Sequence, residues 1–401
     1  MKILITAAQF SSHISGLQRH ALNMVRCLLT QPDISSVHLV LAPWQRELAE
    51  AAGLHTTSRV TLHIADMAPT PLSRNLWHYR RLPQLAAEIQ PDIVHLSYPV
   101  PVAASAISCP IVLTLHDLYP YEIPENFGFP KVLFNRLILR QCLHAVDAIA
   151  SVSDTTALRM KQYLPRTAQK KSLRIYNCVE PDPVCAEYSP LPDWHGEPFL
   201  LTVSQHRKNK NIPLLIRAFH RLLRGSLVPS RMKLVVIGIT GPETPHIHQL
   251  ISELQLKPNI VFLQGLSEPA LQWCYRHCEA LAAPSETEGF GLPVAEALLA
   301  GCRVLCSDIP AFREIDADHC RFVALGPGAE QRFAQAILAT LQEPPPLLLS
   351  LPQFSSQALG TQYINLYREL LPSAAHIRTA RTPSPNGSRY LVQRKDERDY
   401  L

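Results

Sequence analysis

The 401-residue sequence lacks long apolar runs, CxxC pairs and any dense stripe of basic residues. Without a run of about 18 apolar residues no membrane span is expected, and the apolar start MKILITAAQF is too short for a signal peptide. The ten cysteines are irregularly spaced and indicate packed free thiols in a reducing cytoplasm rather than a zinc site. A net charge of +5 is mild for this length and does not predict a nucleic-acid partner.

The sequence does contain a repeated alternation of strand and helix patterns. In residues 1–182 the segments MKILITAA, SVHLVLAP, PDIVHLSY, CPIVLTLHD, DAIASVSD and LRIYNCV have the composition of strands, and helical patterns such as LQRHALNMVRCLL lie between them. A proline-rich stretch over 183–198 predicts a linker, after which the alternation resumes through 199–345. This order predicts an α/β protein of two domains, each with a mostly parallel sheet covered on both faces.

The end of the chain has a different pattern. Residues 346–371 contain one more amphipathic helix, SQALGTQYINLYREL. Residues 372–401 are rich in Pro, Ser, Arg and Asp and have no apolar face, so a disordered tail is expected there.

The segment SQHRKNKN, residues 204–211, places three cations between a predicted strand and a predicted helix. A helix N-terminus attracts anions through its free N–H groups and its dipole. Arg207, Lys208 and Lys210 could therefore hold a diphosphate there. A solvated basic loop would have the same composition, so this motif alone leaves both interpretations open.

The segment PSETEGFGLPVAE, residues 284–296, places two acids around a glycine-spaced turn. Gly289 and Gly291 allow a tight turn and close approach of the backbone to a ligand. Glu288 precedes the turn, and Glu296 falls in the first turn of the following helix. The two acids could accept hydrogen bonds from hydroxyl pairs on two sugars, with phosphate facing the N–H groups between them. Alone, Glu296 needs no role beyond complementing the helix dipole.

The stretch EGFGLPVAE resembles the E-x7-E signature of retaining glycosyltransferases with the GT-B fold, in the large family numbered four. Other segments resemble that family in the same order: SGLQRHALNMVRCLL, LTLHD, ASVSD, IYNCVEPD, KNIPLLIRAF and NIVFLQGLSEPALQWCYRHCEALAAPSETEGFG. The resemblance spans roughly residues 1–371. It implies two Rossmann-like α/β domains that face each other across a cleft, with a C-terminal helix that crosses back to the first domain.

The resemblance also implies roles for single residues. A donor-binding set would come from the first loop and the E-x7-E segment: Gly16, Gly289, Phe290, Gly291, Leu292 and Glu296. Within this set Glu296 would hold the ribose, and the amides between the two acids would hold the donor sugar. A catalytic set would contact the reacting sugar and the leaving diphosphate: His116, Arg207, Lys210 and Glu288.

Two positions depart from the family pattern. Gln205 stands where an arginine is usual, so Arg207 or Lys208 is the candidate to replace it. Cys178 stands where a glycine usually follows the asparagine, here Asn177, which questions the shape of that turn.

The implied activity is transfer of a hexose from a GDP- or UDP-linked donor to a glycan or lipid-linked acceptor, as in bacterial cell-surface polysaccharide synthesis. No cofactor or metal is expected, because Arg207 and Lys210 could neutralise the diphosphate and no D-x-D-like pair that would hold a metal is recognised in the sequence. The expected location is the cytoplasm or the inner face of its membrane. The cations Lys170, Lys171, Arg174, Arg136 and Arg140 would allow contact with anionic lipid, although a solvated surface explains them more simply.

Other functions fit parts of the pattern. Glu288 and Glu296 could be the acid and base of a glycoside hydrolase. A nicotinamide-dependent oxidoreductase is disfavoured, because no G-x-G-x-x-G follows the first strand. A non-catalytic sugar-nucleotide-binding subunit, or another GT-B enzyme acting on sugar nucleotides, would share the same motifs.

Overall fold

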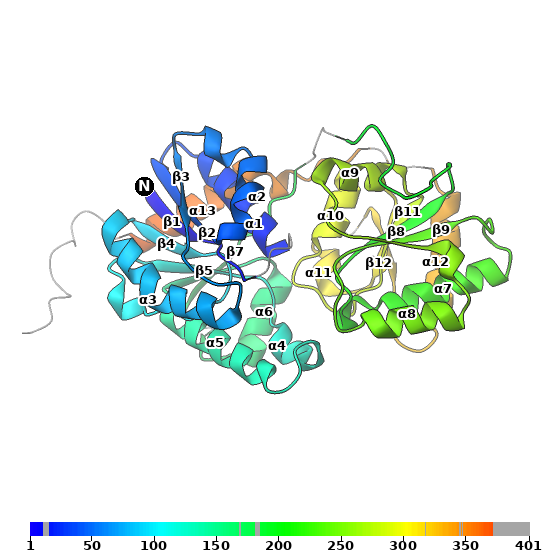
Figure 1. Cartoon of the computed structure of the whole chain (residues 1–401), viewed down its shortest axis with the longest axis horizontal. Coiled ribbons are helices and arrows are strands. Elements are labelled where there is room, and N and C mark those ends of the chain that lie inside the picture. The colour runs from blue at the N-terminus through cyan, green and yellow to red at the C-terminus, as the bar shows by residue number, and fades with distance from the viewer. Residues whose placement is uncertain are drawn as a thin grey trace, which may run out of the picture.

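The computed structural model describes residues 1–10, 16–167, 170–180, 185–316, 318–344, 346 and 348–371. Within these residues the chain forms two parallel β-sheets, each with helices on both faces (Figure 1). The α/β class predicted from the sequence is therefore confirmed. The tail over 372–401 lies outside the described residues.

The first sheet has the strand order β3-β2-β1-β4-β5-β6-β7. Its strands are β1 (Lys2–Thr6), β2 (Ser36–Leu41), β3 (Val60–Ile64), β4 (Ile93–Leu96), β5 (Ile111–Leu115), β6 (Ala148–Ser151) and β7 (Lys171–Arg174). In the central strand β1, Ile3 lies opposite Val37 of β2 and Ile93 of β4. Strands covered on both faces need apolar residues along their whole length, and β4, β5 and β6 are buried throughout.

Helices cover both faces of this sheet. They are α1 (Gly16–Leu29), α2 (Arg46–Ala51), α3 (Pro71–Ile89), α4 (Tyr119–Glu122), α5 (Lys131–Ala145) and α6 (Asp154–Tyr163). Residues of α3 and α5 belong to one core cluster, whereas α1 belongs to a second cluster on the other face. Among the described residues, no helix combines the length and apolar character needed to cross a membrane.

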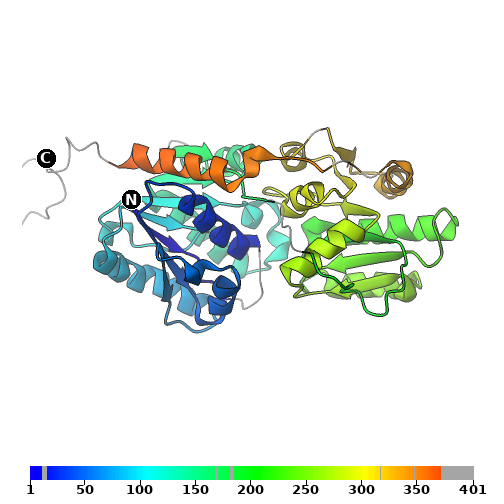
Figure 2. The same ribbon diagram turned by 90° about the horizontal axis from the view of Figure 1, so that it is seen from above.

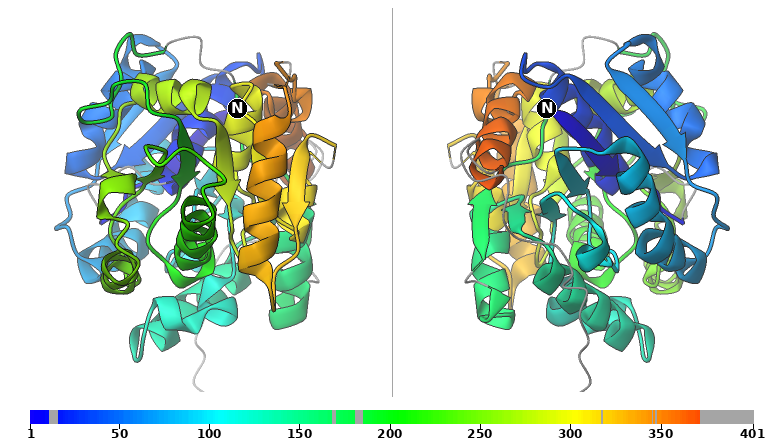
Figure 3. Two further views of the ribbon diagram at one scale, coloured as in Figure 1. Left: turned by 90° about the vertical axis from the view of Figure 1, so that its right-hand side faces the viewer. Right: turned by 90° about the vertical axis from the view of Figure 1, so that its left-hand side faces the viewer.

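The second sheet has the order β10-β9-β8-β11-β12-β13. Its strands are β8 (Phe199–Val203), β9 (Lys233–Ile237), β10 (Ile260–Leu263), β11 (Ala280–Ala283), β12 (Val304–Ser307) and β13 (Cys320–Val323). Its helices are α7 (Ile212–Arg224), α8 (Thr244–Glu253), α9 (Glu268–His277), α10 (Leu292–Leu299), α11 (Pro310–Arg313) and α12 (Ala329–Gln342). The end-on views of Figure 3 show the layers of helices beside each sheet.

Each sheet has one position where the chain reverses its direction of winding. In the first sheet β1 lies between β2 and β4, and in the second β8 lies between β9 and β11. Parallel α/β sheets bind ligands beyond the carboxyl ends of the strands at such switch points. The loops after β8 and β11 are therefore the first place to look for a site.

The last helix, α13 (Ser356–Leu370), leaves the second unit and runs along the first (Figure 2). Its Gly360 lies against α1 so closely that an added Cβ would be 2.3 Å from the carbonyl oxygen of Cys27. Tyr363 and Tyr367 of the same helix are almost fully buried. The predicted return of the C-terminal helix to the first domain is therefore observed.

Three details differ from the sequence-based expectation. The strands β3 and β13 have no counterpart among the strands expected from the sequence. The expected strand LRIYNCV is shorter and begins earlier, because β7 covers Lys171–Arg174 and pairs with β6 at the edge of the sheet.

Candidate active site

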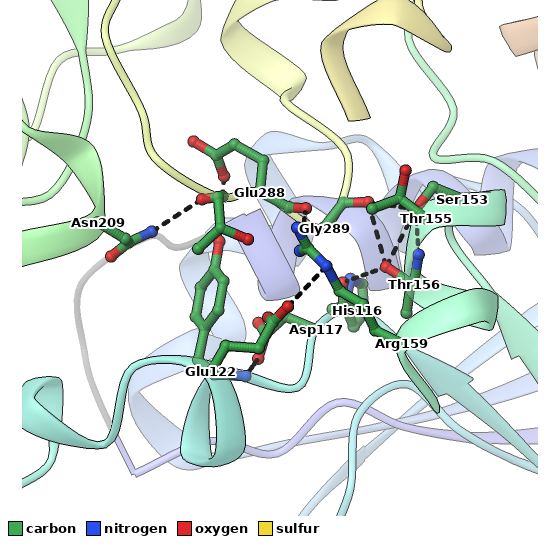
Figure 4. Close-up of polar contacts among 12 residues, drawn as sticks. His116, Asp117, Glu122, Ser153, Thr155, Thr156, Arg159, Asn209, Glu288 and Gly289 are labelled. Atoms are coloured by element: carbon green, nitrogen blue, oxygen red, sulfur yellow. Dashed lines mark hydrogen bonds and ion pairs between the residues drawn. The ribbon is translucent and has the colours of Figure 1, made fainter. Parts of the chain in front are cut away.

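The loops after β5, β8 and β11 bring the predicted catalytic residues together between the two sheets. His116 follows β5, Lys210 follows β8, and Glu288 lies in the loop between β11 and α10. Figure 4 shows these loops facing one another, with residues of β6 and α6 beside them. Residues from both halves of the chain therefore form one site.

The carboxylate of Glu288 is the most densely bonded group of this site. Both of its oxygens accept from Lys210 Nζ, at 2.5 and 2.7 Å, and Ser285 Oγ donates to Oε1 at 2.8 Å. Tyr119 Oη, from the first domain, donates to Oε2 at 3.1 Å. Glu288 is only 8% exposed. In this structure the predicted diphosphate-binding lysine is thus paired with the predicted sugar-binding acid.

A second acid, Asp117, lies on the same side of the cleft as His116. Burial raises its pKa, while Arg207 and Lys210 act in the opposite direction. The charge of Arg207 thus reaches this carboxyl group, and its replacement of the arginine missing at Gln205 stays a prediction. A small cavity of about 20 Å³, lined by residues of the second domain, lies against Lys210 and Glu288.

Gly289 lies in close contact with the backbone of the first domain. A Cβ at this position would be 1.8 Å from the carbonyl oxygen of His116, so no larger residue fits without moving one domain. The Gly289 carbonyl accepts from Ser153 Oγ at 2.5 Å and from Thr156 Oγ1 at 3.2 Å (Figure 4). The glycine is required here for contact with protein as well as for any contact with a ligand.

His116 is held in one tautomer by its neighbour. Its Nε2 lies 2.9 Å from the carbonyl oxygen of Ser97, which can only accept, so Nε2 carries the proton and Nδ1 is left as an acceptor. Burial lowers the pKa of His116 to about 4. The ring is therefore neutral at pH 7, and its edge contacts His20 with the ring centroids 4.5 Å apart.

Glu296 is bonded from both domains. Its Oε1 accepts from Arg19 of α1 at 3.2 Å, and its Oε2 accepts from Tyr275 of α9 at 2.7 Å. Arg19 also contacts Glu268 at 2.7 Å. Glu296 therefore has specific partners, which a residue that only complemented the helix dipole would not need.

The remaining predicted donor-binding residues form the turn into α10 and its surroundings. Gly291 has a φ of 107°, and a Cβ there would be 2.6 Å from the Phe312 ring. The Phe290 side chain is buried against Tyr176 and Phe354, so only its backbone faces the cleft region. A Cβ on Gly16 would be 3.6 Å from Leu292 Cδ1, which places the start of α1 beside the start of α10.

Four residues that now belong to the site had no role in the sequence analysis: Arg19, Tyr119, Glu122 and Arg159. Arg159 is paired with Glu122 at 2.7 Å and donates to the Glu288 carbonyl at 3.2 Å. All four lie on helices of the first domain, and only Arg19 falls in a segment that resembles the family, SGLQRHALNMVRCLL. That resemblance assigned no role to Arg19.

The departure from the family pattern at Cys178 has little structural effect. Cys178 is buried and does not adopt a positive φ, so its turn does not require glycine. Asn177 keeps a function, because its Oδ1 bonds to His20 Nδ1 at 2.8 Å.

The sequence does contain an acidic pair with D-x-D spacing, Asp316 and Asp318, which was not recognised from the sequence as a metal-binding pair. Asp316 Oδ1 accepts from the amides of Asp318 and His319, and Oδ2 bonds to His319 Nδ1. Its carboxylate thus stabilises a turn. Among the described residues, no group of three or more His, Cys, Asp or Glu side chains is arranged to hold a metal ion.

Proteins of known function are similar to this chain in sequence. The chain is 24% identical to O-antigen chain mannosyltransferase B of Escherichia coli over 92% of its own length and 100% of the relative. It is 28% identical to O-antigen chain mannosyltransferase RfbU of Salmonella typhimurium, over 56% of its own length and 59% of the relative.

Solved structures share the fold. The structure of Anabaena HepE in complex with UDP and glucose matches with a TM-score of 0.61 and 17% identity, covering 92% of this chain and 98% of that one. WaaG, a glycosyltransferase involved in lipopolysaccharide biosynthesis, matches with a TM-score of 0.63 and 16% identity, covering 92% and 96%.

Two family models divide the chain between them. The one described as Glycosyltransferase Family 4 matches residues 14–183, and the one described as Glycosyl transferases group 1 matches residues 191–352. These matches favour a glycosyltransferase over the hydrolase and oxidoreductase alternatives. The chain belongs to the family 4 type of glycosyltransferases with the GT-B fold.

Proposed function

We propose that this glycosyltransferase moves a hexose, with mannose as the first candidate, from a GDP- or UDP-linked donor to a glycan or lipid-linked acceptor in bacterial surface polysaccharide synthesis. The relatives named as O-antigen mannosyltransferases support the sugar and the acceptor class. The observation that carries the proposal is the pair of acids at the second switch point. Glu288 is bonded to a cation of the neighbouring loop, and Glu296 lies eight positions later on α10.

In the proposed reaction the bond between the anomeric carbon and the donor diphosphate breaks, and a bond to the acceptor hydroxyl forms with retained configuration. Negative charge builds on the diphosphate and positive charge on the sugar ring. Lys210 and Arg207 would stabilise the first charge without a metal. His116 Nδ1 would accept a hydrogen bond from a hydroxyl of the donor sugar, which a neutral ring allows.

Titration calorimetry with GDP-mannose and with UDP-linked hexoses tests the donor. We expect one of them to bind and to release nucleoside diphosphate when a lipid-linked glycan is added, with the same rate in EDTA. The proposal is wrong if well-folded protein binds none of these donors.

The proposal includes contact with a membrane, and the predicted cations fall into two groups that differ in how well they suit it. Lys171 is paired with Glu369, Arg174 with Asp154, and Lys170 donates to the His144 carbonyl. These cations already stabilise the edge of the first sheet. They are therefore a weak basis for lipid binding.

The N-terminal half of α5 is better suited to lipid. Phe129, Leu133, Phe134 and Leu137 are 84%, 51%, 62% and 64% exposed, which is unusual for neighbouring apolar side chains. Lys131, Arg136 and Arg140 lie on the same helix, and no acidic residue occurs between Glu125 and Asp147. An exposed apolar strip with cations matches the interface of an anionic bilayer.

This surface, the α5 surface, also lies near the active site. The preceding helix α4 begins with Tyr119, whose hydroxyl donates to Glu288. A bilayer on the α5 surface would therefore hold a lipid-linked acceptor close to the cleft.

Cosedimentation with phosphatidylcholine vesicles, with and without an equal part of phosphatidylglycerol, tests this contact. We expect binding only to the anionic vesicles, a decrease with salt, and loss in the double variant F134S/L137S. Leu227→Ser, an exposed leucine of the second domain, is the matched control. Equal sedimentation of all variants contradicts the membrane proposal, and salt-independent self-association without vesicles would assign the α5 surface to a second copy of the chain.

A further inference from the structure

The carboxylate of Glu296 is held by an arginine from the opposite domain. Arg19 lies one turn after the start of α1, and its guanidinium bridges Glu296 on α10 and Glu268 at the start of α9. The side chains of Arg19 and Glu296 are 26% and 12% exposed. A two-acid contact of this kind fixes the plane of the guanidinium as well as its charge.

The bonding pattern leaves capacity on Glu296. Oε1 accepts from Arg19 and Oε2 from Tyr275, whose hydroxyl sits on a fully buried ring. Each carboxylate oxygen has two acceptor positions, so one remains on each. Two free positions on neighbouring oxygens match the two adjacent hydroxyls of a ribose.

We propose that Arg19 is a positioning residue for the donor nucleotide, which acts by orienting the Glu296 carboxylate toward the ribose. The inference rests on the proposed function, since it takes Glu296 as the ribose-binding acid. Tyr275 fixes one oxygen from within the second domain, whereas Arg19 fixes the other from the first. The ribose site is thus complete only when the two domains are closed, and by thermodynamic linkage ribose binding stabilises closure.

The test compares nucleotides with and without the ribose hydroxyls. Calorimetry is carried out with UDP and GDP and with their 2′,3′-dideoxy counterparts, on the wild-type chain and on Arg19→Gln. We expect the variant to bind the preferred ribonucleotide about tenfold more weakly, as is usual when a supporting partner of a ligating group is removed. Its affinity for the dideoxy nucleotide should be unchanged. Arg19→Lys keeps the positive charge but loses the planar guanidinium that contacts two acids. This variant should recover part of the ribonucleotide affinity that Arg19→Gln loses.

Arg26→Gln is the matched control, because Arg26 is an exposed arginine on the same helix, bonded to Asn23. An equal loss for ribo- and dideoxy nucleotides overturns the inference, since it would mean a direct contact with phosphate or a general loss of structure. Unchanged binding of both overturns it as well. If the wild-type chain binds neither UDP nor GDP, the proposed function itself fails, and that result is distinct from both.

Discussion

Glu288 and Glu296 are held differently, although one sequence motif contains both. The Glu288 carboxylate accepts from a lysine, a serine and a tyrosine, whereas Glu296 is bonded to an arginine and a tyrosine. A charge-assisted network of this kind fixes a carboxylate before any ligand arrives. At the residue scale the site is therefore preorganised by protein contacts.

Replacing Glu288 by glutamine tests this preorganisation. The amide is nearly isosteric but presents Lys210 with one acceptor atom in place of two, so lysine and sugar should both be misplaced. We expect kcat to fall by about a hundredfold or more, as for removal of a preorganised electrostatic group. Glu286→Gln, two residues earlier and exposed, should retain the wild-type rate. Equal rates for the two variants would contradict the role given to Glu288.

Buried histidines predict a dependence of stability on pH. Burial lowers the pKa of His78 and His116 to about 4 and that of His95 to about 3, from an ordinary value of 6.5. Because the folded-state values lie below the unfolded one, the stabilisation is complete above about pH 6.5 and is lost as the pH falls toward 4. Each of these histidines should therefore lower the free energy of unfolding by about 2 kcal/mol between pH 7 and pH 5.

Urea unfolding at pH 7 and pH 5 measures this loss. His78 lies on α3, outside the site, and its Nδ1 bonds to the Arg74 carbonyl, a contact that an asparagine amide can replace. His78→Asn should therefore reduce the difference between the two pH values, whereas His144→Asn, at an exposed position, should leave it unchanged. Burial also raises the pKa of Asp117 and Glu122, which opposes the loss of stability at low pH. This opposing effect is the same in the wild type, in His78→Asn and in His144→Asn.

At the scale of elements, strongly periodic segments could be predicted and interrupted ones could not. The helix SQALGTQYINLYREL is observed as α13 with the same limits, because an apolar stripe and the cap Ser355 define it locally. The strand β3 is only partly buried, so its apolar pattern is weak, and β13 has four residues. Arg19 and Tyr119 have functions only because another domain lies opposite them, which local sequence does not encode.

The contact between α1 and α13 gives a prediction for Gly360. An added methyl group would meet the Cys27 carbonyl at 2.3 Å, as well as Thr30 and Gln31, so Gly360→Ala should push the two helices apart. Overpacking of this type costs about 1–3 kcal/mol. Chemical denaturation should show that loss for Gly360→Ala and a much smaller change for Thr361→Ala, the exposed neighbour. A Gly360→Ala protein as stable as the wild type would mean that the helices can separate freely.

For the whole molecule, the main feature is the closed arrangement of the two domains. The amides of Asp154 and Thr155, at the start of α6, donate to Glu314 of the second domain at 2.7 Å each. The Glu314 carboxylate is therefore a direct link between the two domains.

Glu314→Ala should favour the open arrangement, because it leaves two amides of α6 without their partner. Small-angle X-ray scattering should give a larger radius of gyration for this variant than for the wild type without ligand. Glu330→Ala, which breaks an exposed contact with Arg217 inside the second domain, is the matched control. Identical scattering of Glu314→Ala and the control would show that this carboxylate does not hold the domains together.

The return of α13 to α1 also affects biosynthesis. Residues 356–370 cover a face of the domain whose strands are made first, so that face stays uncovered while the ribosome completes the second domain. The N-terminal half therefore cannot finish folding during translation. A nascent chain that stalls before residue 356 would expose apolar surface to chaperones and proteases, and both halves of the enzyme must mature together after release.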